Sequence, residues 1–163
     1  LTYSGSAATR LSGLAHLETE NVSILTNGAT HNSKVVASAA VALDVSATKA
    51  QVGLPYNSTL QTMRLEAGAT DGTAQGKVKR IDEATVRLFR TVNAMVGGDL
   101  TTLDRISFRS AADSMDEPVP LFTGDKSIEM PSGFDQDGYV VVQQDLPLPM
   151  TLISVIARAQ TFD

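Results

Sequence analysis

The segment from residue 77 to about residue 92 constrains the fold of this chain more than any other. Val86 and Leu88 alternate along it with Arg87 and Phe89. A period of two places apolar side chains on one face of an extended chain and polar side chains on the other. Aromatic and β-branched residues favour strands as well. The sequence therefore predicts a β-strand here, the longest of the chain.

Shorter extended segments occupy much of the remaining chain. They are separated by turns, as at Asn27-Gly28, a dipeptide that favours a type I′ hairpin because both central residues need a positive φ. Strands are expected at residues 21–26, 34–36, 41–45, 51–56, 60–67, 105–109, 127–130, 139–144 and 151–159. Helical periodicity is scarce, and helix is expected only around residues 38–43 and 111–116. The predicted fold class is all-β, a mainly antiparallel, sandwich-like β assembly with little helix.

The expected organisation is a flexible segment followed by two β domains. Residues 1–12 begin with Leu1 rather than Met, and they lack the basic and apolar regions of a signal peptide. We expect this segment to be flexible and to mark a cut inside a longer polypeptide. The predicted units are a small β unit at residues 13–58 and a larger antiparallel β domain at residues 59–163.

Composition disfavours several kinds of site. The chain of 163 residues has no Cys, and therefore neither a disulfide framework nor a thiolate zinc site. It has no Trp and few other aromatic residues on which sugars or bases would stack. Its net charge of −5 argues against tight binding to a phosphate backbone, although a repulsive wall would let DNA slide past. No apolar run approaches the roughly 20 residues that a membrane helix needs.

Positive charge concentrates in one part of the sequence. Its members lie in or next to the long predicted strand and are Lys77, Lys79, Arg80, Arg87 and Arg90. Such a group could contact DNA phosphates in a channel or the carboxylates of a neighbouring subunit. It could equally be an exposed strand face whose charges prevent edge aggregation. We favour salt bridges between subunits or the exposed face.

A second group is expected near loop tips in the last third of the chain. Its members would contact a partner and are Phe122, Phe134, Asp135, Asp137 and Tyr139. Asp135 and Asp137, followed by Gly138, also resemble the start of a calcium loop. However, Gln144 stands where an EF-hand needs a bidentate Glu. We therefore favour a hairpin turn in which the Asp side chains accept backbone hydrogen bonds.

No catalytic, cofactor-binding or metal-binding residues are assigned. His16 and His31 could approach each other around a hairpin, but a metal site would want a third ligand. No nucleophile elbow is present, and no recognised motif places a His beside a Ser and an Asp. The carboxylate pair of a glycosidase stays open, with Glu18, Glu66, Asp82, Glu83 and Glu129 as its candidates. The scarcity of aromatic platforms favours an ordinary acidic surface instead.

Three longer segments follow one another in the chain. They are GLAHLETENVSILTNGATH, VGLPYNSTLQTMRLEAGATDGTAQGKVKRIDEATVRLFRT and FTGDKSIEMPSGFDQDGYVVVQQDLPLPMTLISVIA, and they cover most of residues 13–157. In their order and spacing they resemble the C-terminal portion of the tail nozzle (tail tubular) proteins of short-tailed bacteriophages and prophages. The chain departs from that family at Thr19, where members often have the Gly of His-Leu-Glu-Gly. It has Asn27-Gly28 where members often have Asp-Gly.

The resemblance implies a structural protein without catalysis. In the family, a homo-hexameric ring surrounds the DNA exit channel of the tail, contacts other tail proteins and lets DNA pass without specific binding. It implies no cofactor, no small-molecule substrate and no membrane span. The expected location is the virion, after synthesis in the cytoplasm of the bacterial host. The alternative is a host-surface binding module of a phage or prophage tail, with Phe122, Phe134 and Tyr139 in an exposed patch.

Overall fold

The computed structural model describes residues 1–66, 73, 75–130 and 133–162. Strands make up 57% of the structure and helix 2%, and the strands form three antiparallel sheets. These proportions confirm the predicted all-β fold class. The chain divides into one compact unit of residues 1–57, 109–120 and 145–148 and another of residues 58–108, 121–144 and 149–163.

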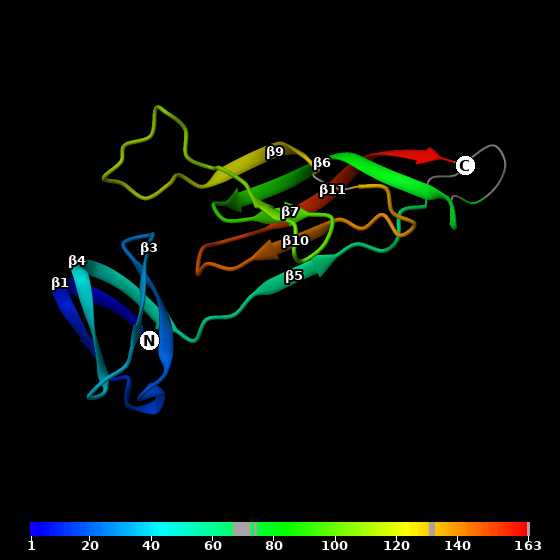
Figure 1. Ribbon diagram of the computed structural model, residues 1–163. Coiled ribbons are helices and arrows are strands. Elements are labelled where there is room, and N and C mark those ends of the chain that lie inside the picture. Colours follow the sequence, from blue (N-terminus) through cyan, green and yellow to red (C-terminus); the bar gives the residue numbers. More distant parts are fainter. Residues whose placement is uncertain (67–72, 74, 131–132, 163) are drawn as a thin grey trace. The chain divides into compact units, whose positions relative to one another are not determined.

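The first unit contains a four-stranded antiparallel sheet with the strand order β1-β4-β2-β3 (Figure 1). Its elements are β1 (Thr2–Ser12), the short 3₁₀ helix η1 (Ala15–Leu17), β2 (Asn21–Thr26), β3 (Ala29–Val35) and β4 (Ala40–Gly53). Leu14, Val22 and Ile24 are fully buried in its core. Asn27 and Gly28 join β2 to β3, and both have the positive φ that the predicted hairpin turn needs.

The expectation of a flexible segment over residues 1–12 is wrong. Nearly all of these residues belong to β1, which pairs with β4 from Thr2 to Ser12 with register shifts around Ala8. Leu11 is buried in the core of the unit. The small Ser, Gly and Ala side chains carry little strand propensity, so the sequence gives no alternating pattern here. The strand is defined by its backbone pairing with β4.

Neither segment in which helix was expected is helical. Ser38 and Ala39 form a turn in which both residues have positive φ, and β4 begins directly after it at Ala40. The carboxylate of Glu18 accepts hydrogen bonds from the Ser38 and Ala39 amides, at 2.8 and 2.7 Å. This contact from a distant part of the chain holds the turn and overrides a weak local helical preference. Residues 111–116 form turns and bends.

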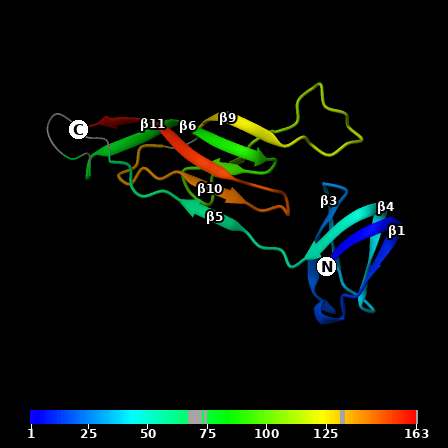
Figure 2. The ribbon, with the colours of Figure 1, turned by 180° about the vertical axis from the view of Figure 1, so that it is seen from behind.

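The second unit contains two sheets. One has the order β5-β10-β7-β8 and the other the order β11-β6-β9, in which both outer strands run antiparallel to β6. The strands of the first sheet are β5 (Ser58–Gln61), β7 (Met95–Gly97), β8 (Leu103–Arg105) and β10 (Val141–Gln144). Those of the second are β6 (Val78–Thr91), β9 (Phe122–Glu129) and β11 (Leu152–Phe162). Figures 1 and 2 show β9 and β11 on either side of β6.

The core of this unit draws on both sheets. Val86 and Leu88 of β6 are fully buried, as are Val96 of β7 and Val142 of β10. Arg87, between the two β6 residues, is exposed. The long strand therefore has the alternation that the sequence predicts.

The phase of this alternation changes at Asp82. Arg158 of β11 pairs with Glu83, and the next residue of β11 pairs with Ile81, so Asp82 is an extra residue in β6. Before this bulge the odd-numbered residues Lys79 and Ile81 are buried, whereas after it the even-numbered residues Ala84, Val86 and Leu88 are buried. A one-residue insertion moves all following side chains to the opposite face, and this places Lys79 on the core side.

Candidate functional site around Lys79 and the 133–139 loop

Six of the ten residues in the two predicted groups meet at the beginning of β6. They are Lys79 and Arg80 from the basic group, and Phe134, Asp135, Asp137 and Tyr139 from the loop group. The backbone of Lys79 joins that of Asp135 by two hydrogen bonds, of 2.7 and 2.8 Å, which form an isolated antiparallel bridge. This bridge fixes the loop of residues 133–139 against the strand.

Lys79 lies under this loop and is only 1% exposed. Its aliphatic stem packs against Gly138, where an added Cβ would lie 3.0 Å from the Lys79 Cδ. Its Nζ donates a hydrogen bond of 3.2 Å to the carbonyl oxygen of Leu65. The expectation that Lys79 belongs to a charged interface or channel wall is therefore wrong, because the bulge at Asp82 turns its side chain inward.

Arg80 points to the outside and supports the exposed aromatic residue of the loop. Its guanidinium carbon lies 6.0 Å from the centre of the Phe134 ring, a distance at the limit of a cation–π contact. Its Nε lies 3.1 Å from Oδ1 of Asp82. Phe134 itself is 60% exposed. Phe134 is therefore accessible at the loop, as predicted.

Arg64 holds the other end of the loop, and no motif in the sequence indicated this residue. Its Nε lies 2.9 Å from Oδ1 of Asp137 and donates a hydrogen bond of 3.1 Å to the Tyr139 hydroxyl. The bond to Tyr139, together with the charge of Asp137, raises the pKa of Arg64 above its ordinary value. The Asp137 carboxylate is therefore paired with the Arg64 guanidinium. Among the residues that the structure describes, no three His, Cys, Asp or Glu side chains are grouped to hold a metal ion.

A cavity of about 290 Å³ lies beside the loop. Its lining residues come from β6, the 133–139 loop and the turn after β7, and include Lys79, Asp99, Thr102, Phe134, Asp135 and Tyr139. Asp99 is occupied within its own turn, where Oδ1 accepts hydrogen bonds from the Thr101 amide and hydroxyl and from the Thr102 amide. These bonds lower the pKa of Asp99. The cavity is about as large as the smallest ligand pockets of proteins.

The remaining predicted residues lie elsewhere in the second unit. Arg87 pairs with Asp125 across β6 and β9, and Arg90 has a φ of 48° next to a register shift between these strands. Lys77 lies just before β6. Phe122 is not at a loop tip: it begins β9 and packs against the core, with its ring 5.9 Å from that of Phe108.

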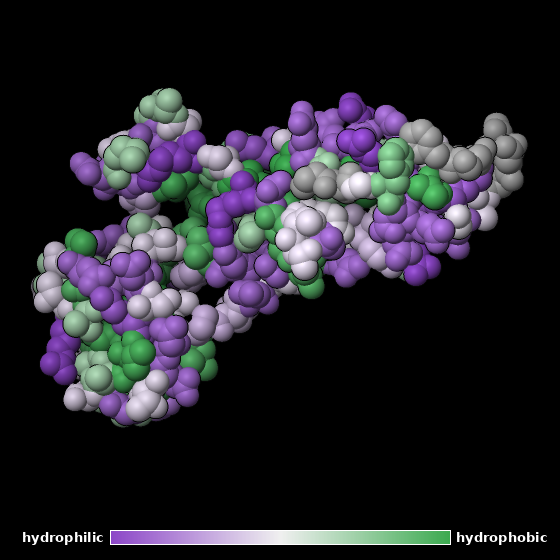
Figure 3. Space-filling model, in the orientation of Figure 1, coloured by the Kyte–Doolittle hydropathy of each residue, from purple (hydrophilic) through white to green (hydrophobic). Residues whose placement is uncertain are grey.

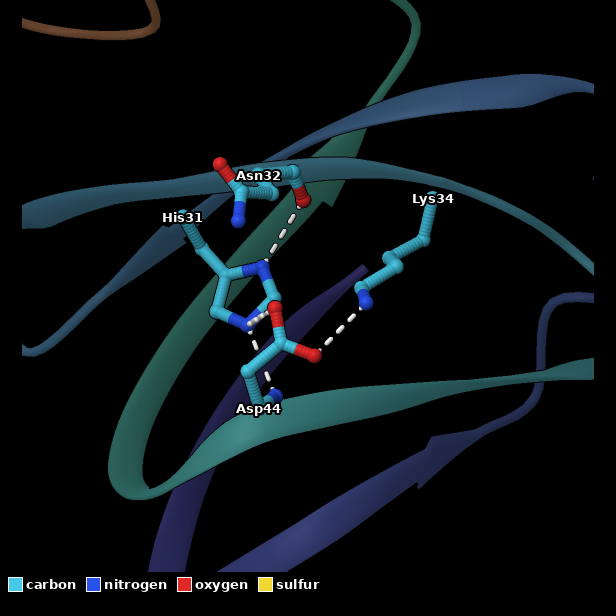
Figure 4. Close-up of polar contacts among 4 residues, drawn as sticks. All are labelled: His31, Asn32, Lys34 and Asp44. Carbon is cyan, nitrogen blue, oxygen red and sulfur yellow. Dashed lines mark hydrogen bonds and ion pairs between the residues drawn. The ribbon is translucent and has the colours of Figure 1, made fainter.

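The two histidines do not form a site. Both ring nitrogens of His31 are engaged: Nδ1 donates to the Asn32 carbonyl and Nε2 accepts from the Asp44 amide, each over 2.8 Å (Figure 4). Lys34 Nζ donates a hydrogen bond of 2.6 Å to the Asp44 carboxylate, and this bond lowers the pKa of Asp44. His16 lies in η1. The cluster in Figure 4 therefore joins β3 to β4 and leaves no nitrogen of His31 for a metal.

The candidate carboxylates of a glycosidase are distributed over different elements. Glu18 belongs to the first unit, and Glu66 accepts a hydrogen bond from the Thr73 hydroxyl. Glu83 of β6 and Glu129 of β9 are brought together, since the strand register places them directly opposite each other. The side chain of Asp82 is largely buried, and its Oδ2 has no hydrogen-bond partner among the described residues.

No protein-family model matches the chain, and no curated protein matches it. Within the described part of the chain, no helix is long and apolar enough to span a membrane. On the face shown in Figure 3, hydrophilic side chains are spread over both compact units.

Proposed function

We propose that this chain is a non-enzymatic structural module of a bacteriophage tail, of the kind that forms the nozzle ring around the DNA exit channel. The ordered resemblance of three segments to nozzle proteins motivates the proposal. These segments coincide with folded elements: the first contains η1 and β2, the second ends with β6, and the third spans β9, β10 and much of β11.

The observation that carries the proposal is the use of charge to fix strands and loops. Arg87 is paired with Asp125, Arg80 lies beside Asp82, and Arg64 holds Asp137. Each pair joins two backbone segments or stiffens one. Charged side chains that are paired within the chain in this way are consistent with a structural scaffold.

The same pairs are consistent with passage of DNA without specific binding. Binding to a phosphate backbone depends on lysines and arginines that neutralise phosphates and release counterions. Arg87 and Asp125 already neutralise each other, and Lys79 is buried. Together with the net charge of −5, these features disfavour tight binding of DNA phosphates.

Electron microscopy of the purified chain in negative stain tests this function. The proposal predicts closed rings with an axial opening. Particles without rings that adhere to bacterial cells would contradict it and favour the host-surface binding module, for which the exposed Phe134 is the supporting observation. In that case Phe134→Ala should reduce adhesion, while Leu54→Ala, at a comparably exposed apolar residue of the other unit, should not.

A further inference from the structure

The sheet of β11, β6 and β9 has two outer edges, formed by β9 and β11. β6 is central and pairs with both neighbours, and within the described residues no strand pairs with the outer edge of β9 or of β11. Both outer strands are antiparallel to β6, so they run parallel to each other. An unpaired strand edge presents a row of backbone donors and acceptors that another strand can use.

The apolar side chains of the outer strands are incompletely covered. Val86 and Ala84 of β6 are fully buried, whereas Val155 of β11, opposite Val86, and Ile128 of β9, opposite Ala84, are only partly buried. Ile153 and Ile156 of β11 are 59% and 52% exposed. β11 also contains no Pro and no Lys, residues that commonly protect an edge strand from pairing. A strand added at this edge would cover apolar surface.

One row of charges across this sheet is incomplete. The register places Arg158 of β11, Glu83 of β6 and Glu129 of β9 side by side. Arg158 Nη1 lies 3.3 Å from Oε2 of Glu83. Glu129 faces the like charge of Glu83, an unfavourable arrangement, and no partner for its carboxylate is found among the described residues. The row therefore has a cation at one edge and an uncompensated anion at the other.

We propose that copies of this chain associate by parallel pairing of β9 of one copy with β11 of the next. The rows of residues that lie side by side across the sheet of one copy then continue into the sheet of the next copy with the same register. Glu129 lies beside the partner's Arg158, and Ser127 lies beside the partner's Ile156. Ile128 gains contact with the partner's Ala157 on the inner face. The like-charged neighbours Glu83 and Glu129 are thereby flanked by an arginine on each side.

The two edges differ, so the contact is heterologous. A heterologous contact repeats from copy to copy, and it gives a ring when the rotation closes and a filament when it does not. Pairing of β11 with a second β11 would bring two Arg158 edges together and would leave Glu129 uncompensated. The charges therefore favour β9 with β11. The proposed function requires copies of the chain to associate, and the β9–β11 contact is the way in which they do so. The evidence for this contact comes from the two edges of the sheet.

Disulfide trapping tests the contact directly, because the chain has no Cys of its own. Adjacent residues of paired strands have Cα atoms near 5 Å apart, within the range that a disulfide spans. We expect an oxidised mixture of Glu129→Cys and Arg158→Cys chains to form a covalent heterodimer. Either variant alone should stay largely uncrosslinked. Equal crosslinking of Arg158→Cys alone, or absence of the mixed dimer, would overturn the proposed pairing.

Charge reversal provides a second test that is independent of cysteine chemistry. Glu129→Arg and Arg158→Glu should each weaken self-association several-fold, and the double variant should restore it, since it rebuilds the same contact with the charges exchanged. A double variant that is as weak as the sum of its parts would contradict the pairing. Circular dichroism of each variant confirms that its fold is retained.

These tests separate the contact from the function. Rings without the mixed disulfide would overturn the β9–β11 contact and leave the nozzle proposal standing. Open filaments with the disulfide would support the contact and contradict the ring.

Discussion

Arg87 of β6 and Asp125 of β9 form a two-point contact across the sheet. Arg87 Nε donates to Oδ1 and Nη2 donates to Oδ2, each over 2.8 Å. The planar guanidinium matches the carboxylate, so the pair sets the distance and register of the two strands as well as adding electrostatic energy. The pair lowers the pKa of Asp125 and raises that of Arg87.

This pair predicts a pH dependence of stability. Because the pKa of Asp125 is lowered in the folded state, its contribution is present above the ordinary pKa of an Asp and is lost as pH falls through the lowered value. Arg87→Gln should therefore destabilise the protein near neutral pH. The difference from the wild type should shrink below about pH 4. Urea unfolding at several pH values measures it, and a difference that stays constant down to about pH 2 would contradict this role.

Lys79 should matter through its stem more than through its charge. Lys79→Ala removes a buried side chain that packs against Gly138, and should cost about 2–3 kcal/mol of the free energy of unfolding. Lys79→Met keeps the volume and should cost less than about 1.5 kcal/mol. Urea unfolding of the two variants makes the comparison. Equal losses would show that the bond from Nζ to the Leu65 carbonyl is the larger contribution.

Gly97 should tolerate no side chain. An added Cβ would lie 2.2 Å from the carbonyl oxygen of Thr102, because β7 and β8 approach closely at this point. Backbone atoms cannot move aside as a flexible side chain can, so Gly97→Ala should destabilise the protein by about 1–3 kcal/mol. Gly133→Ala in the same unit is the control, since a Cβ there meets nothing within 4 Å. A thermal midpoint of Gly97→Ala equal to that of the control would contradict the close approach.

A substitution in the turn before β4 should increase the stability of the protein. Ala39 has a φ of 55°, a conformation that costs residues with a Cβ about 1–2 kcal/mol. Ala39→Gly removes this strain, and after the greater freedom of Gly in the unfolded chain it should still raise stability by about 0.5–1 kcal/mol. Ala40→Gly, one residue later and inside β4, should lower it. Guanidinium unfolding of both variants measures the effect, and a loss of stability in Ala39→Gly would show that the turn is unstrained.

Strands were predicted well from the sequence where polar and apolar side chains alternate. They were predicted poorly where backbone pairing alone defines the strand. The alternation of Val86 and Leu88 with Arg87 marks β6, and Asn27-Gly28 marks the β2–β3 hairpin. β1 was not predicted because it pairs with β4 through backbone atoms, and its side chains show no alternating pattern. The strand predicted at residues 105–109 is displaced to Leu103–Arg105, and that predicted at residues 60–67 to Ser58–Gln61, with residue 67 outside the described residues.

The candidate site shows the same limit. Proximity of the 133–139 loop to β6 follows from the backbone bridge between Lys79 and Asp135, which no local pattern encodes. The bulge at Asp82 changes which face Lys79 occupies, and a sequence read with a constant period of two cannot show it. Arg64 was missed for a related reason, since its partner Asp137 lies far along the chain.

Self-association through matching sheet edges is the central claim, and absolute mass measured by light scattering during size exclusion tests it most directly. The measurement covers a range of protein concentrations and includes Glu129→Arg beside the wild type. We predict that the 17.2 kDa chain reaches the mass of a hexamer as concentration rises, and that Glu129→Arg remains smaller at every concentration. A wild-type chain that stays monomeric at the highest concentration, or a variant that assembles equally well, would contradict the account.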